Sequence, residues 1–373
     1  MAELFERTSI NSMSLANRFV RSATWEGMAE KDGSVTPRLT EMMVELARGE
    51  VGLIISGYTF ISPEGQSNPG QLAVYDDRFL PGLREMVRAL HAAGGKIALQ
   101  VVHGGCSANP KLSGREPIGP SAREKDGRRT CRAAVRKDIA AIVSAFAGAA
   151  GRAKQAGFDA VQIHAAHGFL LSQFLSPAFN ERKDEYGGTL ENRARLLLEV
   201  VRSIREAVGP DYAVLIKINS EDFLDGGMTR GEAVQVAGML EKASVDAIEL
   251  SGGTVASPQK FLPPRPGRLE TPEQEVYYRE AARLYKQRVR VPLMLVGGIR
   301  SYGVAEEFVR DGTADYISMS RPLICEPGLV KRWRAGDRRP AECVSDNACF
   351  APGLAGQGIY CVTMAKKRGN AGQ

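Results

Sequence analysis

The sequence has no apolar stretch long enough to span a membrane, and its N-terminal residues MAELFERTSINSMSLANRF contain no apolar signal-peptide core. These two absences predict a cytoplasmic protein without a membrane partner. Lysine and arginine outnumber aspartate and glutamate only modestly, 49 to 43, and no known nucleic-acid-reading motif accompanies the basic clusters. We therefore expect no nucleic-acid partner. The mild positive charge suits an anionic or phosphorylated small ligand.

Cysteine and histidine are both scarce. Six cysteines in 373 residues do not form a disulfide framework, and in a reducing compartment they suggest free thiols or metal ligands. Three of the six, Cys343, Cys349 and Cys361, are crowded near the C-terminal end. Two of the four histidines, His164 and His167, lie three positions apart. A pair at this spacing suits one small anion, one metal ion or a purely structural role.

Short apolar or β-branched segments alternate with longer segments of helical periodicity. Eight such strand–helix units without a break in composition predict an α/β protein with one (β/α)₈ barrel, rather than a doubly wound sheet. The expected strands are residues 18–23, 51–57, 96–102, 158–164, 213–219, 245–252, 291–298 and 314–320. The expected helices include residues 79–94, 142–157, 190–209 and 230–243.

The barrel is expected to occupy residues 1–340, and residues 341–373 to form a cysteine-containing extension that packs on it. Long loops follow the third and fourth strands, at residues 103–137 and 165–193. Barrel enzymes keep their chemistry after the C-terminal ends of their strands. These loops are therefore expected to shape the site.

Glycines and polar residues after the last strands predict a phosphate site, because barrel enzymes often bind phosphate there. Gly297 and Gly298 follow the seventh strand and have no Cβ to keep a phosphate away from the backbone. Ser320 and Arg321 follow the eighth strand and add a hydroxyl and a bidentate cation. Gly253, after the sixth strand, fits the same corner. A tight structural turn beside a surface arginine is the alternative.

Two polar residues interrupt apolar strands. The side chain of Gln100 can both donate to and accept from a planar heterocycle. Burial of Lys217 is costly unless it faces an anion or an electron-rich ring edge, although a lysine that reaches solvent at the barrel rim is the alternative. Small residues after the first strand, in RSATWEG, would let a flat ligand lie against the backbone. Together with the phosphate site, these features predict flavin mononucleotide (FMN).

The chain resembles the Old Yellow Enzyme family of NAD(P)H:flavin oxidoreductases along nearly its whole length. The resemblance lies in LANRFVRSATWEG, GLIISGYTFISPEG, QVVHGG, HAAHGFLLSQFLSPAFNERKDEYGGTLENRARLLLEV, KINSEDF, LVGGIRS and MSRPLI. It implies an FMN-dependent ene-reductase that reduces activated alkenes, such as enones, by hydride transfer from the flavin N5. NADH or NADPH would be the reductant, and no dinucleotide fingerprint chooses between them. Barrels of this kind often pair, so a homo-oligomer is compatible with the resemblance.

The resemblance also implies residue roles. His164 and His167 would bind and polarise the electrophilic group of the substrate, whereas a metal site there lacks further ligands at metal spacing. The implied catalytic residues are His164, His167 and Tyr58, and the implied substrate pocket contains Trp25, His164, His167 and Phe169. The implied cofactor-binding residues are Ala23, Thr24, Tyr58, Gln100, His164, Lys217, Gly253, Gly297, Gly298, Ser320 and Arg321.

Two positions near the expected pocket depart from the family pattern. Phe169 stands where relatives usually have the tyrosine that protonates the substrate. Tyr58 or an ordered water is the expected replacement, unless the natural reaction needs no such proton, as with nitro compounds, quinones or a dehydrogenation. Trp25 stands where relatives often have a small hydroxyl or thiol residue, and it is expected either to narrow the pocket or to pack structurally.

A third departure lies in CVSDNACFAPGLAGQGIYCV, from Cys343 to Val362. Some larger relatives bind a four-iron cluster with C-x₂-C-x₂-C and a distant fourth cysteine. Here Asp346 takes the place of the second ligand, beside Cys343, Cys349 and Cys361. Because iron–sulfur clusters prefer sulfur ligands, we expect a relic segment and no metal. Two alternative functions stay open: an FMN-dependent amine dehydrogenase that uses such a cluster, and a flavin-binding barrel with little turnover.

Overall fold

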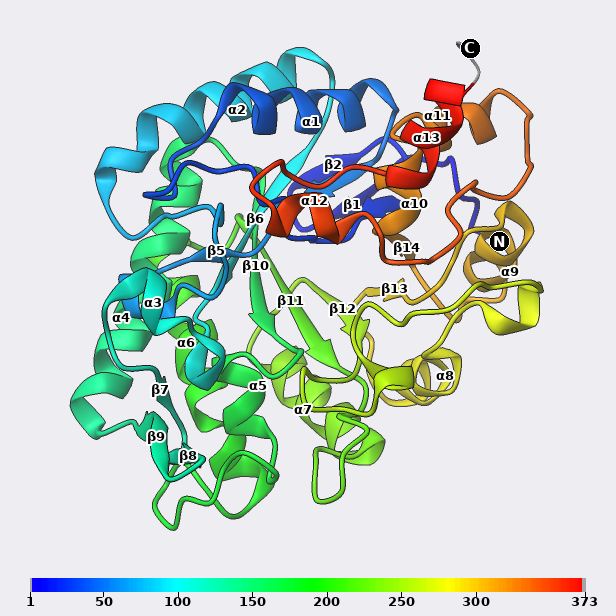
Figure 1. Cartoon of the computed structure of the whole chain (residues 1–373). Coiled ribbons are helices and arrows are strands. Elements are labelled where there is room, and N and C mark those ends of the chain that lie inside the picture. The colour runs from blue at the N-terminus through cyan, green and yellow to red at the C-terminus, as the bar shows by residue number, and fades with distance from the viewer. Residues whose placement is uncertain (1, 371–373) are drawn as a thin grey trace.

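A computed structural model describes residues 2–370 of the chain and contains the predicted barrel (Figure 1). Its parallel strands follow one another in the order of the sequence, and the ring is closed because the last strand pairs with the first. The eight strands are β3 (Phe19–Arg21), β4 (Leu53–Ile55), β6 (Ile97–Val102), β10 (Ala160–Ala165), β11 (Ala213–Asn219), β12 (Ala247–Ser251), β13 (Leu293–Val296) and β14 (Tyr316–Met319). All eight overlap predicted segments, so the predicted fold class is confirmed.

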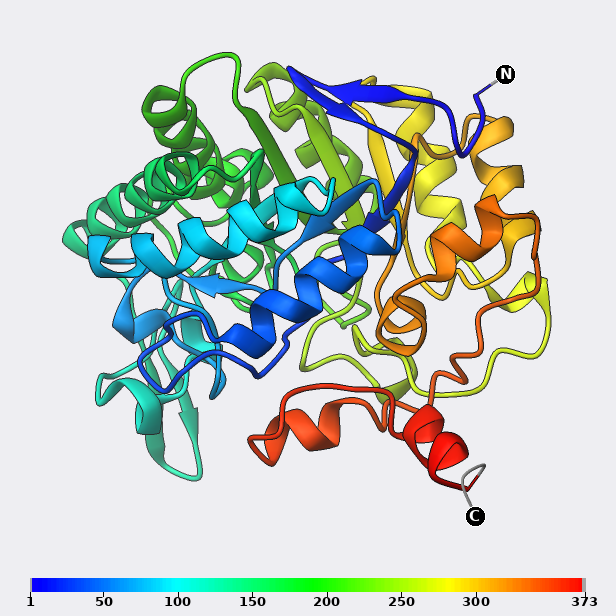
Figure 2. The same ribbon diagram turned by 90° about the horizontal axis from the view of Figure 1, so that it is seen from above.

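Helices surround the barrel and cover the outer face of its strands (Figure 2). They are α1 (Pro37–Arg48), α2 (Leu80–Ala92), α4 (Arg136–Ala156), α6 (Leu190–Val208), α7 (Arg230–Lys242), α8 (Arg279–Arg288) and α9 (Tyr302–Arg310). Every residue of β6, β10 and β11 is buried, which explains their nearly continuous apolar character. Local signals set the helix ends: Thr229 and Glu232 form a capping box at the start of α7, and Gly157, with φ 93°, ends α4.

An N-terminal hairpin seals the bottom of the barrel. It consists of β1 (Thr8–Ile10) and β2 (Met13–Leu15), which pair antiparallel. Ile10, Met13 and Leu15 belong to one buried cluster with the inner residues of the barrel strands. Because this end is plugged by side chains, the opposite end of the barrel is the one that can accept a ligand.

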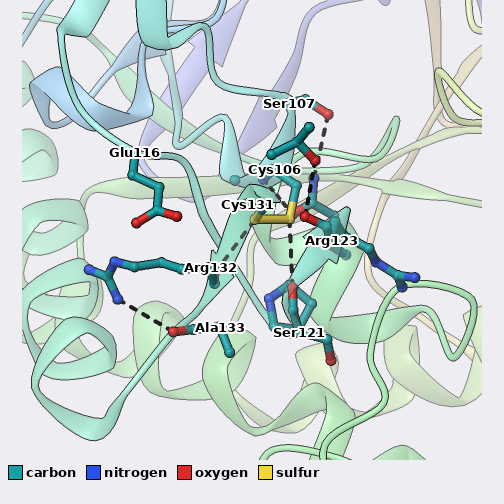
Figure 3. The surroundings of a disulfide bond; sticks show 12 residues. Cys106, Ser107, Glu116, Ser121, Arg123, Cys131, Arg132 and Ala133 are labelled. Atoms are coloured by element: carbon teal, nitrogen blue, oxygen red, sulfur yellow. Dashed lines mark hydrogen bonds between the residues drawn. A yellow bond between two sulfur atoms is a disulfide. The ribbon is translucent and has the colours of Figure 1, made fainter. Parts of the chain in front are cut away.

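The loop after β6 folds into a small subdomain that contains a disulfide. It contains η3 (Gly105–Ser107), α3 (Pro110–Ser113), β7 (Ile118–Gly119), β8 (Arg123–Lys125) and β9 (Arg128–Ala133). The β8–β9 hairpin brings Cys131 to Cys106 with a Cα–Cα distance of 5.1 Å, and the two form a disulfide (Figure 3). The expectation that the cysteines are free thiols or metal ligands is therefore wrong for this pair. The spacing along the chain gave no sign of the hairpin that joins them.

The C-terminal segment lies across the open end of the barrel (Figure 2). Backbone and side-chain hydrogen bonds attach it to loops that follow three different strands: Ile359 N donates to Glu26 O, Arg321 Nη1 to Ser345 O, and Asn347 Nδ2 to Pro264 O.

The remaining elements are β5 (Thr59–Phe60), α5 (Leu170–Leu175), α10 (Arg321–Cys325), α11 (Leu329–Arg334), α12 (Phe350–Leu354), α13 (Val362–Asn370), and short 3₁₀ turns at η1 (Pro63–Gly65), η2 (Asp77–Phe79), η4 (Gln259–Phe261) and η5 (Pro272–Gln274). Among the described residues, no helix is both long and apolar enough to cross a membrane.

Candidate active site

A cavity of about 540 Å³ opens at the C-terminal end of the barrel. It brings together most of the residues that the sequence indicated: Ala23, Thr24, Trp25, Tyr58, His164, His167, Phe169, Lys217, Gly297, Gly298, Ser320 and Arg321. Gln100 and Gly253 do not line it. A Cβ at Gly253 would lie 2.0 Å from the carbonyl oxygen of Phe261, so the close approach of its neighbour in η4 explains this glycine without a phosphate.

His164 and His167 form the polar part of the cavity wall. Their ring centroids are 5.1 Å apart and the rings are nearly perpendicular, at 86°. His164 Nδ1 accepts a hydrogen bond from Ala166 N at 3.3 Å, which leaves the proton on Nε2. His167 Nε2 lies 2.7 Å from Ser251 Oγ. Across residues 2–370, no group of three or more histidine, cysteine or acidic side chains is arranged to hold a metal ion.

Both imidazoles are neutral at neutral pH. Burial holds the pKa of His164 and that of His167 well below their ordinary values, and the Lys217 ammonium lowers both further. A neutral imidazole offers one N–H donor and one acceptor. The pair can therefore donate to an electrophilic group in the cavity without adding a formal charge.

The end of β11 fixes the backbone of His167. This residue has φ 65°, a left-handed conformation that is uncommon for residues other than glycine. Its N–H donates to Asn219 Oδ1 at 3.1 Å, and Asn219 Nδ2 in turn donates to Asp222 Oδ1 at 2.8 Å. Neither residue was predicted to belong to the site, although KINSEDF contains Asn219 at the end of the strand and Asp222 shortly after it.

Phe169 and Tyr58 stand side by side next to His164. The Phe169 ring centroid is 4.9 Å from that of His164 and 5.2 Å from that of Tyr58. The Tyr58 hydroxyl accepts a hydrogen bond from Asn68 Nδ2, so its own proton is left for another acceptor. Burial raises the pKa of Tyr58, which keeps the phenol protonated. A phenolic donor is thus present beside the phenylalanine that replaces the usual one.

A row of buried polar side chains crosses the barrel interior beneath the histidines. Lys217 Nζ donates to Ser22 Oγ at 2.8 Å and lies 3.2 Å from Glu249 Oε2. Gln162 Nε2 also donates to Glu249 Oε2, at 2.9 Å, and Gln162 Oε1 accepts from Gln100 Nε2 at 2.6 Å. Lys217 is therefore buried and paired, rather than extended to solvent at the rim.

The glycine corner after β13 has the open backbone that the sequence indicated. Gly297 and Gly298 have φ 130° and 79°, and a Cβ on Gly298 would lie 2.7 Å from the ring of Tyr277. Ser320 Oγ lies 2.6 Å from Thr24 Oγ1 across the cavity wall. Arg321 Nη1 donates to Asn347 Oδ1 at 2.7 Å, and so links the C-terminal segment to this corner.

Several buried polar atoms around the cavity fit a phosphorylated heterocycle such as FMN. Within the described part of the chain, Gln100 Oε1, Arg300 Nη1 and Ser318 Oγ have no hydrogen-bond partner. Arg300 and Ser318 line the cavity, whereas Gln100 lies deeper. An unpaired buried polar group costs about 1–3 kcal/mol, so a ligand that supplies the missing partners would be stabilised here. The residues present therefore fit the cofactor that the sequence predicted.

The C-terminal cysteine motif departs from a four-cysteine cluster site at Asp346. Asp346 Oδ2 accepts from Thr363 Oγ1 at 2.8 Å, and Asp346 Oδ1 accepts from Ala348 N at 3.1 Å, so the carboxylate serves the local turn. Burial raises the pKa of Cys349 to about 11 and also raises that of Cys343. Cys361 Sγ lies 3.5 Å from Sγ of Cys325, a cysteine that the sequence motif did not include.

Trp25 has both roles that the sequence left open. Its side chain lines the cavity and is only 8% exposed. The indole Nε1 donates to Pro69 O at 3.0 Å. A Cβ on Gly353 of α12 would lie 3.0 Å from the indole ring, so Trp25 also supports the C-terminal segment.

We expect the stability of the protein to fall below about pH 6.5 because of its buried histidines. Burial lowers the pKa of His103 to about 4 and those of His164 and His167 well below 6.5. The unfolded chain then binds protons that the folded protein does not, which removes up to about 1.4 kcal/mol per histidine per pH unit. Urea unfolding at about pH 7 and pH 5.5 measures this dependence. H164N/H167N should weaken it, and an equal pH dependence in that variant would contradict the assignment.

Comparison with known proteins agrees with the geometry. The sequence pattern of the NADH:flavin oxidoreductase / NADH oxidase family matches residues 3–339. An NADH oxidase of Thermoanaerobacter brockii is 36% identical over 92% of this chain, which spans about half, 52%, of that protein. A 4,4′-dithiodibutanoate disulfide reductase of Rhodococcus erythropolis is 32% identical, with 93% of this chain and 92% of that protein covered.

A solved structure gives the same result for the fold. A 2-naphthoyl-CoA reductase in complex with 2-naphthoyl-CoA superposes with a TM-score of 0.87 at 28% identity. The match covers 96% of this chain and 56% of that one. The family match covers nearly the whole described barrel, and the cavity brings together most of the residues that the resemblance implied. The chain therefore belongs to the NADH:flavin oxidoreductase / NADH oxidase family, the Old Yellow Enzyme family of flavin oxidoreductases.

Proposed function

We propose that the protein is an FMN-dependent NAD(P)H oxidoreductase that reduces activated alkenes, such as enones. The observation that carries the proposal is the pair of neutral histidine donors, His164 and His167, in the wall of a cavity whose floor holds a buried lysine. When bound, FMN would accept two electrons from a nicotinamide dinucleotide and pass them to the acceptor.

The chain's own residues would hold the cofactor at three places. Ala23, Thr24 and Tyr58 offer backbone and ring contacts, as the family resemblance implies, and Lys217 lies beneath them. Arg300 and Ser318 supply donors that lack a partner among the described residues, next to the open backbone of the glycine corner. Ser320 and Arg321 complete the proposed phosphate site. The cavity lining supports this assignment for all of these residues.

The histidines would orient and polarise the substrate. Two N–H donors aimed at one oxygen withdraw electron density from a conjugated C=C bond, and preorganised donors of this kind give a large part of the rate enhancement in many enzymes. Tyr58 would deliver the proton to the substrate carbon, since Phe169 has none to give. The hydroxyl that Asn68 holds beside Phe169 supports this role.

Acceptors that need no proton on carbon are the second candidate class. The absence of a hydroxyl at Phe169 favours them, and they include quinones, nitro compounds and organic disulfides. The full-length relative from Rhodococcus erythropolis is a disulfide reductase by name. The C-terminal motif has Asp346 in the place of the second cysteine ligand, so we favour these two acceptor classes over the amine dehydrogenase.

Steady-state oxidation of NADH and NADPH with a panel of acceptors tests the proposal. The panel contains cyclohexenone, a maleimide, a quinone, a nitro compound and 4,4′-dithiodibutanoate. We expect turnover with the enone and the maleimide. Turnover confined to the quinone, the nitro compound or the disulfide would support the second class, and no turnover with any acceptor would contradict both.

A further inference from the structure

The buried carboxylate next to Lys217 has no place in the proposed catalytic steps. We propose that Glu249 lowers the reduction potential of the bound flavin by partly neutralising Lys217, and so makes the reduced enzyme a stronger electron donor. The inference rests on the proposed function, because it assumes that FMN occupies the cavity above Lys217. Glu249 would be a positioning and tuning residue, since it acts through the lysine.

The register of the barrel places the two charges together. Lys217 in β11 pairs with Glu249 in β12 and with His164 in β10, so the three residues lie at one level of neighbouring strands. The Lys217 and Glu249 side chains are 3% and 0% exposed, and their charged atoms are 3.2 Å apart. The lysine lines the cavity, whereas the glutamate is behind it.

The surroundings leave the lysine as the main partner of the carboxylate. Glu249 Oε2 accepts from Gln162 Nε2 at 2.9 Å. Glu249 Oε1 is buried and has no hydrogen-bond partner within residues 2–370. A buried ion pair persists only where its charges compensate each other, so much of the lysine's field is cancelled locally.

The consequence for a flavin follows from Coulomb's law. Reduction places negative charge on the ring system, and an uncompensated ammonium at the floor of a cavity with low dielectric would stabilise that charge strongly. The paired lysine still supplies a hydrogen-bond donor but a weaker field. The paired lysine therefore stabilises the reduced flavin, relative to the oxidised flavin, less than a lone lysine would. Electrons accepted from a nicotinamide are accordingly passed on more readily to the substrate.

The test is the midpoint potential of bound FMN, measured by anaerobic photoreduction against reference dyes without nicotinamide or acceptor. E249Q removes the negative charge at nearly constant shape, so the midpoint potential of its FMN should rise. The equilibrium constant for reduction should increase at least tenfold, which corresponds to about 30 mV for two electrons. K217M should shift the potential in the opposite direction. In the K217M background, E249Q should have a much smaller effect, because the carboxylate acts through the lysine.

Two further variants keep the test decisive. E249D draws the charge back by one methylene, and we expect a smaller positive shift, which repeats the test if E249Q does not retain FMN. E232Q breaks the ion pair of Glu232 with Arg193 at the start of α7, away from the cavity lining, and should leave the potential unchanged. An unchanged potential in FMN-bound E249Q or E249D would overturn the inference. A wild-type protein that binds no FMN would instead contradict the proposed function.

Discussion

Replacing both His164 and His167 with alanine should slow the reduction of cyclohexenone by the reduced enzyme at least about 10²–10³-fold, since loss of a single oxyanion donor typically has this effect. The two rings lie together in the cavity wall as neutral N–H donors, so the double substitution removes both donors. Stopped-flow mixing of the photoreduced enzyme with cyclohexenone measures this step apart from reduction by the nicotinamide.

His91, a histidine outside the cavity, provides a matched control. His91 lies on α2 at the surface, and its Nε2 is 2.8 Å from Asp159 Oδ2. H91A should leave the rate of enone reduction unchanged. H164N and H167N keep a shorter amide donor at each position, and we expect intermediate rates. If the double alanine variant reduced cyclohexenone as fast as the wild type does, the histidine pair would not be what polarises the substrate.

Removing the Tyr58 hydroxyl should have the second large effect. General-acid assistance is typically worth about 10²–10⁴-fold, so Y58F should lose about that factor in alkene reduction. Reduction of a quinone needs no proton on carbon and should change far less. The ratio of the two rates, measured with the same enzyme preparation, separates loss of the proton donor from loss of FMN or of folding.

Phe169 allows a rescue experiment. Its ring centroid lies 5.2 Å from that of Tyr58 and 4.9 Å from that of His164, so a hydroxyl added to this ring would enter the same part of the cavity. F169Y in the Y58F background should restore part of the alkene activity. Full alkene activity in Y58F alone would assign the proton to water. A large gain from F169Y in the wild type would argue against a natural substrate that needs no proton.

The barrel could be predicted because its strands are nearly continuous apolar runs between amphipathic helices, and β6, β10 and β11 are buried throughout. Site residues that are unusual for their local position in the sequence could also be predicted. His164, Lys217 and Gly298 are each unusual for their position in a strand or turn, and all three line the cavity.

The residues that were missed depend on contacts between distant segments. Gln162 and Glu249 interrupt apolar strands as visibly as Lys217 does, but their importance arises from pairing across three strands. Cys106 and Cys131 are brought together only when the β8–β9 hairpin folds onto η3. Asn68 lies in the loop that follows β5 and donates a hydrogen bond to the hydroxyl of Tyr58. No periodicity in the sequence encodes that hydrogen bond.

Anaerobic mixing of the purified protein with NADH, and separately with NADPH, tests most directly whether the protein is a nicotinamide-dependent flavoenzyme. We expect the protein to carry FMN and at least one nicotinamide to bleach its absorbance, with colour restored when cyclohexenone or another acceptor of the panel is added. A protein that holds no flavin, or a bound flavin that neither nicotinamide bleaches, would contradict the proposed function.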